Sequence, residues 1–292
     1  MITALSNFEE EMKKALETIK QHSTAQSDDL AMLKQIEVSS FDLPDSRPLD
    51  MLAIDGSHSF ILNFSTRWLA VIKIAALLYE FVEGEKTGFR LKDVFLLEKP
   101  EVISTDAERT GEIEMPKENS HLNIANELRR YYEHEVLNRL SSKLSNTLIA
   151  MDGALTTPFL PKFQQKMAST LKSCKENGNI ITGISKDSQT RAFGARMSDE
   201  ELLSLHHHRG LGYAKVPSQF MQRYKPPLYG DIYFARLFLN AKRWFRVDIA
   251  GNAEEAFPQL AAYSRSQLCP GYPYPLLEAH RFAVSVRPDS YT

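Results

Sequence analysis

The chain has 292 residues, of which 43% are hydrophobic and 25% are charged, and its formal net charge is −2. A chain of this length and composition forms one large globular domain with insertions or two small ones, which excludes collagen-like, coiled-coil and globally disordered proteins. Because the whole molecule is not a polycation, a nucleic-acid partner has to meet a local basic groove rather than an overall positive charge.

The cysteines and the apolar segments indicate a protein of the reducing cytoplasm. Cys174 and Cys269 are far apart and form no CxxC pair, which disfavours a zinc site or a disulfide framework. The charged, amphipathic N-terminus lacks the apolar core of a signal peptide. The longest apolar stretch, Trp68–Val82, is only about 15 residues long and contains two charged residues, whereas a membrane span needs roughly 20 apolar residues. We therefore expect no membrane segment, and a buried strand or helix at this stretch.

The first half of the chain is predicted to pass from a helical extension into strands. Residues 1–45 are expected to form a polar helical extension that ends in the proline-bearing linker DLPDSRPLD. Within Met51–Ser59, a short apolar run ends in Asp55-Gly56, which predicts a strand followed by a tight turn. With the apolar stretch after it, this strand is expected to form a hairpin of two or three strands. Residues 85–120 are charged and proline-bearing, and we expect strand and loop there.

The middle of the chain alternates predicted helices and strands. Apolar residues at three- and four-residue spacing predict one helix over Asn119–Leu144. Thr147–Leu155 then contains a second apolar run that ends in Asp-Gly, at Asp152-Gly153, and we expect another strand there. A second helix is expected over Phe159–Asn177, and a further strand with a polar exit over Asn179–Ser188.

The remainder of the chain begins with a span, residues 191–227, that holds three consecutive histidines, basic residues and prolines, and we expect an insertion or a binding loop there. Two more strands are predicted over Asp231–Leu239 and Arg243–Gly251, followed by a proline-punctuated entry into a final helix within Pro270–Val286. The whole order of elements is typical of an α/β fold with a mixed sheet.

Two aspartates are the strongest candidates for chemistry. Asp55 and Asp152 each follow an apolar run, where a ligand can approach the rim of a sheet, and the next glycine lets the main chain come close to a phosphate or a metal. If the two strands are neighbours, both carboxylates point into one crevice and suit Mg²⁺ or Mn²⁺. Two such ions activate a water and stabilise the leaving oxygen in phosphodiester cleavage. Asp-Gly is also a common turn signal, so a purely structural role stays open here.

A two-metal site needs more oxygen ligands, and the helix predicted over Asn119–Leu144 offers Glu127, Glu133 and Glu135. Helical phase favours Glu133, because apolar residues follow it three, four and seven positions later. Glu135 is followed by polar residues and points in a more solvated direction. We prefer Glu133 and keep the other two as alternatives, while a solvated surface position is the competing interpretation for each of them.

Three further residues are candidates for the same site. His280 follows a proline-rich turn and can ligate a metal or carry a proton to the leaving group, although a half-buried structural histidine has the same spacing. Asp248 lies between apolar neighbours, either as a further carboxylate of the site or on the polar face of a strand. Lys186 ends a predicted strand, where a lysine can pair with a phosphate, although an ordinary exposed lysine also fits.

The predicted insertion carries the segment His206-His207-His208-Arg209. Consecutive histidines do not converge on one ion as histidines four residues apart on a helix do, so a solvated or DNA-contacting loop is the better prediction. Basic and aromatic residues alternate over this span, a pattern that suits a path for single-stranded DNA and that mixed basic loops also show. They are Arg191, Arg196, Arg209, Lys215, Arg223 and Lys225, with Tyr213, Phe220 and Tyr224 between them.

Five ordered segments of the chain resemble the NurA nuclease family. They are AIDGS at residues 53–57, MDGAL at 151–155, GISK at 183–186, FRVD at 245–248 and GYPYPLLEAH at 271–280. The resemblance runs from residue 50 to residue 285, so the N-terminal 45 residues lie outside it, and the histidine-rich segment matches no family pattern. No single motif is decisive, and the specificity comes from finding five of them in order.

The resemblance implies a ribonuclease-H-like core with a mixed sheet, flanking helices and an insertion at 191–227, within a nuclease domain that covers residues 46–292. It implies degradation of DNA with manganese (or magnesium), by 5′-to-3′ exonuclease activity on linear duplex ends and by endonuclease activity on single strands. It also implies a cytoplasmic homodimer with a central channel, which works with a HerA-type hexameric ATPase in the resection of double-strand breaks.

Carried over residue by residue, the family pattern assigns the metal carboxylates to Asp55 and Asp152, and the C-terminal histidine to His280. Tyr272 matches an aromatic residue of the site, although Tyr274 is close enough to confuse the assignment. The predicted catalytic set is Asp55, Glu133, Asp152, Asp248, Tyr272 and His280, of which Asp55, Glu133, Asp152 and His280 bind metal. The predicted DNA contacts are Ser57, Lys186, Arg191 and Arg209.

The competing hypothesis is a non-catalytic ribonuclease-H-like module that binds DNA and docks on a partner ATPase. Such a module has no nuclease activity with any divalent ion. The presence of both aspartates argues against it, because a module freed from catalysis has no physical reason to hold two carboxylates beside DNA phosphates. A third hypothesis, a ribonuclease or resolvase on the same core, differs only in its substrate.

Overall fold

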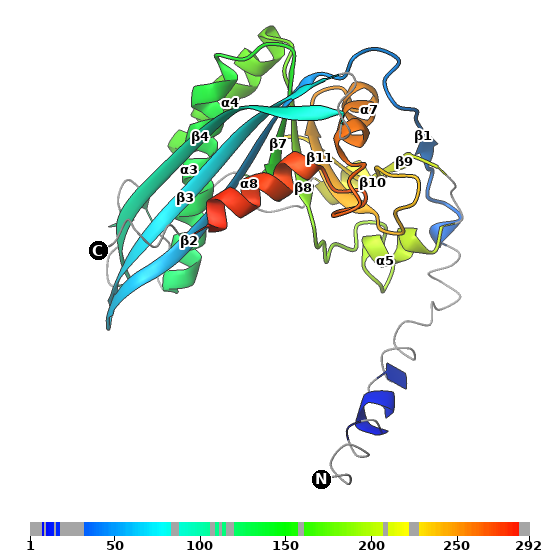
Figure 1. Ribbon diagram of the computed structural model, residues 1–292. Helices are drawn as coiled ribbons and strands as arrows, with labels where there is room; N and C mark the ends of the chain where they lie inside the picture. Colours follow the sequence, from blue (N-terminus) through cyan, green and yellow to red (C-terminus); the bar gives the residue numbers. More distant parts are fainter. Residues whose placement is uncertain are drawn as a thin grey trace.

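The computed structural model of the chain describes residues 8, 10–14, 16–17, 32–82, 88–105, 109–110, 113–114, 120–156, 161–206, 210–221 and 228–285. These residues form a large mixed sheet with helices on both of its faces (Figure 1). The strand order of this sheet is β1-β9-β10-β11-β8-β7-β2-β3-β4. Among the described residues, no helix combines the length and the apolar character that crossing a bilayer requires.

The strands and helices have the following bounds. The strands of the large sheet are β1 (Ser39–Ser40), β2 (Asp50–Phe64), β3 (Arg67–Phe81), β4 (Phe89–Ser104), β7 (Thr147–Asp152), β8 (Ile180–Ser185), β9 (Gly212–Lys215), β10 (Asp231–Arg236) and β11 (Phe245–Ala250). A separate ribbon pairs β5 (Arg109–Thr110) with β6 (Ile113–Glu114). The helices are α3 (His121–Ser141), α4 (Pro161–Glu176), α5 (Asp199–Ser204), α6 (Ser218–Met221), α7 (Ala253–Tyr263) and α8 (Tyr274–Val284).

The direction of strand pairing changes at β2. On one side, β2, β3 and β4 form a long antiparallel meander, which confirms the predicted hairpin and shows that the apolar stretch Trp68–Val82 is a strand. On the other side, β2 pairs with β7 in parallel, and β7 pairs with β8 in parallel. Asp152 therefore ends β7 beside the middle of β2, because β2 continues past the end of its parallel pairing with β7.

Each face of the sheet has its own core, because successive side chains of a strand point to opposite faces. Met51 and Ala53 of β2 belong to the core beneath α7 and α8. Leu52 and Ile54 belong to the core beneath α3 and α4. The same alternation assigns Asp55 to the side of α8 and Gly56 to the side of α3, so β2 presents consecutive residues to two different helices.

The prediction of a tight turn at Asp55-Gly56 is wrong. β2 continues through both residues to Phe64, because it pairs with β3 along its length, and the hairpin turns at Ser65, whose φ is 58°. Gly56 is not among the described glycines with positive φ, so its backbone stays extended. Asp55 therefore sits in the middle of a strand rather than at its end.

The helix predictions are largely confirmed. The helix expected over Asn119–Leu144 is α3, which begins after Ser120, whose side chain accepts a hydrogen bond from the backbone N–H of Asn123. The helix expected over Phe159–Asn177 is α4, and the final helix is α8. The helix α7 was not predicted; it has Asn252 as its N-cap and carries Pro258 in its interior.

The span 191–227 is more structured than a loop. It contains α5, β9 and α6, and β9 pairs with β10 on one side and with β1 on the other, so this span adds a strand to the large sheet. Since β1 lies at residues 39–40, the end of the predicted N-terminal extension also belongs to the sheet. Residues 207–209 and 222–227, with two of the three consecutive histidines, lie outside the described residues.

Candidate metal centre

Asp55 occupies the centre of the candidate site. Only 3% of its surface is exposed, and its Oδ2 lies 2.7 Å from Nδ1 of His280 on α8. Its other oxygen, Oδ1, accepts a hydrogen bond of 2.7 Å from the backbone N–H of Gly56. Burial, followed by the negative charge of Asp152, raises the pKa of Asp55 from 3.8 to about 7.

Asp152 reaches the same place from the end of β7. The parallel register pairs Ile54 with Met151, so Asp55 and Asp152 are the next residues of their strands. β7 ends at Asp152 because Gly153, with a φ of 104°, turns the chain away. Lys186, just after β8, donates a hydrogen bond of 2.7 Å to Oδ2 of Asp152.

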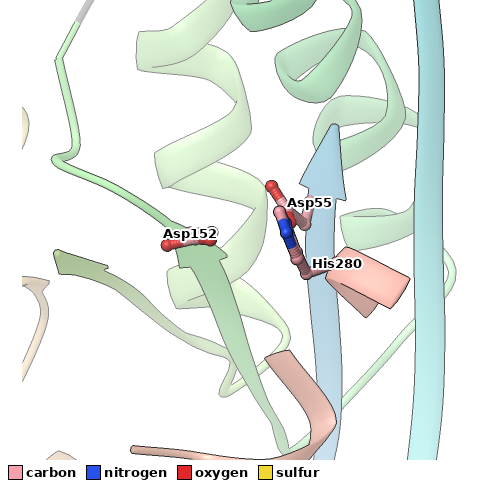
Figure 2. Close-up of side chains that lie close together, drawn as sticks. All are labelled: Asp55, Asp152 and His280. Carbon is pink, nitrogen blue, oxygen red and sulfur yellow. The ribbon is translucent and has the colours of Figure 1, made fainter. Parts of the chain in front are cut away.

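Asp55, Asp152 and His280 together form a group that fits a metal ion. Each offers one ligand atom, and the three atoms all lie within 4.8 Å of one another (Figure 2). Burial and the charges of Lys186 and Arg129 lower the pKa of His280 despite the opposing charge of Asp152, and a neutral imidazole is the form that ligates metals. A buried carboxyl group whose pKa is raised by the charge of a second carboxylate is also a natural place for a cation, which relieves the repulsion between the two.

Glu133 approaches the site from α3, on the other side of β2. It is 4% exposed, and its Oε1 accepts a hydrogen bond from Nη1 of Arg129. A Cβ added at Gly56 would lie 2.6 Å from the same oxygen, so the glycine makes room for this carboxylate. Burial raises the pKa of Glu133 to about 7 against the opposing charge of Arg129, and the charge of Asp55 also raises it.

The other two glutamates of α3 have different surroundings. Glu127 pairs with Arg130 at 3.4 Å, and Glu135 pairs with Lys166 of α4. Glu133 is not in the group of Asp55, Asp152 and His280, but it is the glutamate of α3 whose pKa responds to the charge of Asp55. The geometry therefore favours Glu133 as the helical carboxylate of the site.

Tyr272 and Tyr274 are separated clearly by their positions. Tyr272 is 3% exposed, its ring centroid lies 5.0 Å from Nζ of Lys186, and burial and the charge of Asp152 raise its pKa well above 10. The ring of Tyr274 instead packs against Phe89 and lines a cavity of about 970 Å³ that none of the candidate site residues lines. Tyr272 is therefore the tyrosine that belongs with the metal group.

Asp248 does not belong to the group of Asp55, Asp152 and His280. Its neighbours Val247 and Ile249 face α7 and α8, so Asp248 points to the opposite face of the sheet. It is fully buried, where both of its oxygens accept hydrogen bonds from Arg246, at 2.8 and 3.0 Å, and Oδ2 also accepts one from the backbone N–H of Leu155. These partners hold the carboxylate in place, and the structure separates it from Asp55 and Asp152.

Of the four residues predicted to contact DNA, one lies at the metal group. Lys186 lies at the metal group, against Asp152. Ser57 donates its hydroxyl hydrogen to the backbone oxygen of Ala283, so it ties β2 to the end of α8. Arg191 is exposed, and Arg209 lies outside the described residues.

Arg129 is the residue near the site that the sequence analysis missed. Arg129 belongs to no motif. The sequence feature that could have indicated it is its position four residues before Glu133 on a predicted helix, because side chains at this spacing can form an ion pair. Its charge lowers the pKa of Asp55 and of His280, so it acts on the metal group from the side of α3.

Comparison with known proteins identifies the fold. The sequence matches the NurA domain over residues 49–285, whereas no curated protein sequence matches it. The chain is similar to the NurA nuclease from Sulfolobus solfataricus, with 19% identity, a TM-score of 0.58, and 97% of this chain and 92% of that chain covered. It is also similar to NurA with manganese, with 10% identity, a TM-score of 0.54, and 98% and 95% covered. The predicted ribonuclease-H-like core with a mixed sheet is confirmed.

Proposed function

Because the chain belongs to the NurA family, as its five ordered motifs indicated, we propose that it is a divalent-metal-dependent nuclease that hydrolyses DNA. The observation that carries this proposal is the group of Asp55, Asp152 and His280, whose ligand atoms lie within 4.8 Å of one another. The similar structure of NurA with manganese supports a divalent ion. Carboxylate oxygens and an imidazole accept both Mn²⁺ and Mg²⁺, with the imidazole favouring Mn²⁺.

The residues of the site have separate tasks in this proposal. Asp55, Asp152 and His280 would hold a divalent ion, which would polarise a phosphate oxygen as a Lewis acid and make a bound water more acidic. Lys186 brings a positive charge to the substrate phosphate. Tyr272 keeps its hydroxyl proton, because burial and the neighbouring carboxylates raise its pKa, and it can therefore donate a hydrogen bond.

The finer features of the proposal rest on the family resemblance. We propose 5′-to-3′ exonuclease activity on linear duplex ends, endonuclease activity on single strands, and a role in end resection with a HerA-type hexameric ATPase. We also propose a homodimer and a two-metal site completed by Glu133. Burial and the charge of Asp55 both raise the pKa of Glu133, which disfavours its ionised form. A second cation beside Glu133 would stabilise that ionised form, and this supports Glu133 as a ligand.

The test compares wild type with Asp55→Asn and Asp152→Asn on end-labelled linear duplex and single-stranded DNA, over a titration of Mn²⁺ and of Mg²⁺. The matched control is Asp93→Asn, because Asp93 is an exposed strand aspartate of β4. We expect each site variant to lose about 100-fold or more of the cleavage rate, since several kcal/mol of charge stabilisation depend on the ion, and the control to retain the wild-type rate.

Two results would contradict the proposal. Full activity in both folded site variants would remove Asp55 and Asp152 from catalysis. DNA binding by wild type without cleavage under any divalent ion would instead favour the non-catalytic module. A matched RNA substrate in the same assay distinguishes a ribonuclease from a deoxyribonuclease.

A further inference from the structure

Arg129 lies beside the metal group without being part of it. It is on α3, one helical turn before Glu133, and its Nη1 donates a hydrogen bond to Oε1 of Glu133. A Cβ added at Gly56 would lie 2.9 Å from Cγ of Arg129. Since Gly56 directly follows Asp55, the glycine lets α3 pack close enough to bring this arginine next to the first metal carboxylate.

The charges around Arg129 show which groups it faces. The pKa of its guanidinium is raised by Glu133 first, and also by Asp55 and Asp152, against the lowering effect of burial. In turn, its charge lowers the pKa of Asp55, of His280 and of His58. Arg129 is therefore electrostatically coupled to all three residues of the metal group.

Part of the guanidinium is available to a ligand. The side chain is 23% exposed, and within the described part of the chain its hydrogen bond to Glu133 uses Nη1 alone. Nε and Nη2 have no hydrogen-bond partner among those same residues. A guanidinium carries five N–H donors in a planar fork that matches the oxygens of a phosphate, so the unused donors suit a phosphodiester.

The net charge of the site indicates what the positive charge of Arg129 contributes to phosphate binding. Three carboxylates, Asp55, Asp152 and Glu133, face two cationic side chains, Lys186 and Arg129, which leaves one negative charge while His280 is neutral. The first divalent ion, at Asp55, Asp152 and His280, would turn this into one positive charge, which matches one phosphodiester. Without Arg129 the site that holds this first ion alone would be neutral and would lose its attraction for a phosphate.

We propose that Arg129 binds a phosphate of the DNA strand at the metal centre, from the side of α3, while Lys186 binds from the side of β8. The inference rests on the proposed nuclease function and adds to it a substrate-binding residue that keeps its pairing with Glu133. Arg129 thus links the helix that carries Glu133 to the backbone of the substrate.

The test measures DNA binding rather than cleavage. Affinity for a fluorescein-labelled single-stranded 20-mer is followed by anisotropy in Ca²⁺, which carries the same charge as Mn²⁺, over a range of monovalent salt concentrations, for wild type and Arg129→Gln. The intact length of the 20-mer is checked on a gel after each titration. Each phosphate contact contributes about 0.7 to the slope of log affinity against log salt for single strands. We expect Arg129→Gln to lower the slope by about this amount and the affinity by about 10-fold or more.

Two further variants isolate the phosphate contact. Arg130→Gln is the matched control, because Arg130 is the next residue, is 25% exposed, and pairs with Glu127. Its slope stays at the wild-type value. Arg129→Lys keeps the positive charge and restores most of the slope. Arg129→Gln with Glu133→Gln removes the unpaired buried carboxylate, so it folds even where the single variant does not, and it shows the same reduced slope.

The outcomes separate this inference from the proposed function. A wild-type slope in the folded Arg129→Gln protein or in the double variant would overturn the role of Arg129, while cleavage by wild type still supports the nuclease. An equal loss of slope in Arg130→Gln would also overturn it, because the effect is then a general one of charge on α3. Absence of DNA binding by wild type would overturn both proposals.

Discussion

Asp55 is buried beside a second carboxylate, which is a costly arrangement for the protein without metal. The pKa of Asp55 rises from 3.8 to about 7, first through burial and then through the charge of Asp152. A carboxyl group with a raised folded-state pKa binds its proton more tightly in the folded protein than in the unfolded chain. Ionisation of Asp55 therefore disfavours the folded state, and its full effect is present only above pH 7.

We predict that Asp55→Asn stabilises the metal-free protein at alkaline pH. Below pH 3.8 the wild-type group is protonated in both states, so the two proteins have similar stability. As pH rises from 3.8 to about 7, wild type loses the stability that the protonated Asp55 contributes, whereas the variant has no such group to ionise, until the difference between the two proteins reaches the order of a few kcal/mol. Urea unfolding in EDTA from pH 4 to pH 9 measures it.

The control for this prediction is Asp93→Asn, at an exposed aspartate of β4. Its unfolding free energy should follow wild type at every pH. Parallel curves for wild type and Asp55→Asn would contradict the prediction, since they would mean that the Asp55 carboxyl group titrates alike in the folded and unfolded protein.

At the scale of elements, the packing of α3 on β2 depends on one missing side chain. A Cβ at Gly56 would lie 2.6 Å from Oε1 of Glu133, 2.6 Å from Cδ1 of Ile74 and 2.9 Å from Cγ of Arg129. The φ of Gly56 is not in the left-handed region, so the constraint is one of space rather than backbone conformation. The glycine is therefore a contact point between the strand of Asp55 and the helix of Glu133.

We predict that Gly56→Ala lowers the free energy of unfolding by about 1–3 kcal/mol, the usual cost of an added methyl group in a close-packed interface. It should also weaken metal binding, because α3 has to move away from β2. Urea unfolding and metal titration by calorimetry measure the two effects. The control is Gly210→Ala, where no described atom lies within 4 Å of the added Cβ and only the positive φ of 104° is strained. Unchanged metal affinity in Gly56→Ala would contradict the link between this contact and the site.

The elements that the sequence predicted are those whose signal is local. The helical spacing of α3 and the apolar runs of β7 and β8 are set by neighbouring residues, so they could be found without tertiary contacts. The turn at Asp55-Gly56 was expected from local turn chemistry, but pairing with β3 along the whole strand overrode it. Pro258 inside α7 hid that helix, because proline ordinarily ends a helical pattern.

At the scale of the whole molecule, the site depends on contacts that no local pattern reveals. The family motifs identified Asp55, Asp152 and His280 as residues of one site. Their side chains come together only through the parallel register of β2 with β7 and the packing of α8 on β2. Asp248 lies in a motif of the same kind and faces the other side of the sheet, because the phase of β11 decides its direction. Arg129 has no motif, so only the packed structure could reveal it.

We predict that Mn²⁺ stabilises the folded protein through this assembled site. An ion that binds only the folded state at 100 times its Kd adds about 2.7 kcal/mol to the free energy of unfolding. With an unfolding entropy of about 2.1 cal/mol/K per residue, this raises the Tm of a chain of 292 residues by about 4–5 °C. EDTA should reverse the shift. The unfolded chain cannot reproduce it, since the three ligands are far apart in the sequence.

Site variants decide whether the shift belongs to the metal group. Asp152→Asn and His280→Ala each remove one ligand of the group, so each should lose most of the Mn²⁺-dependent rise in Tm while staying folded in EDTA. Asp93→Asn should keep the whole rise. An equal rise in wild type and in both site variants would place the ion elsewhere, because stabilisation by a bound ion requires the ligands that hold it in the folded state.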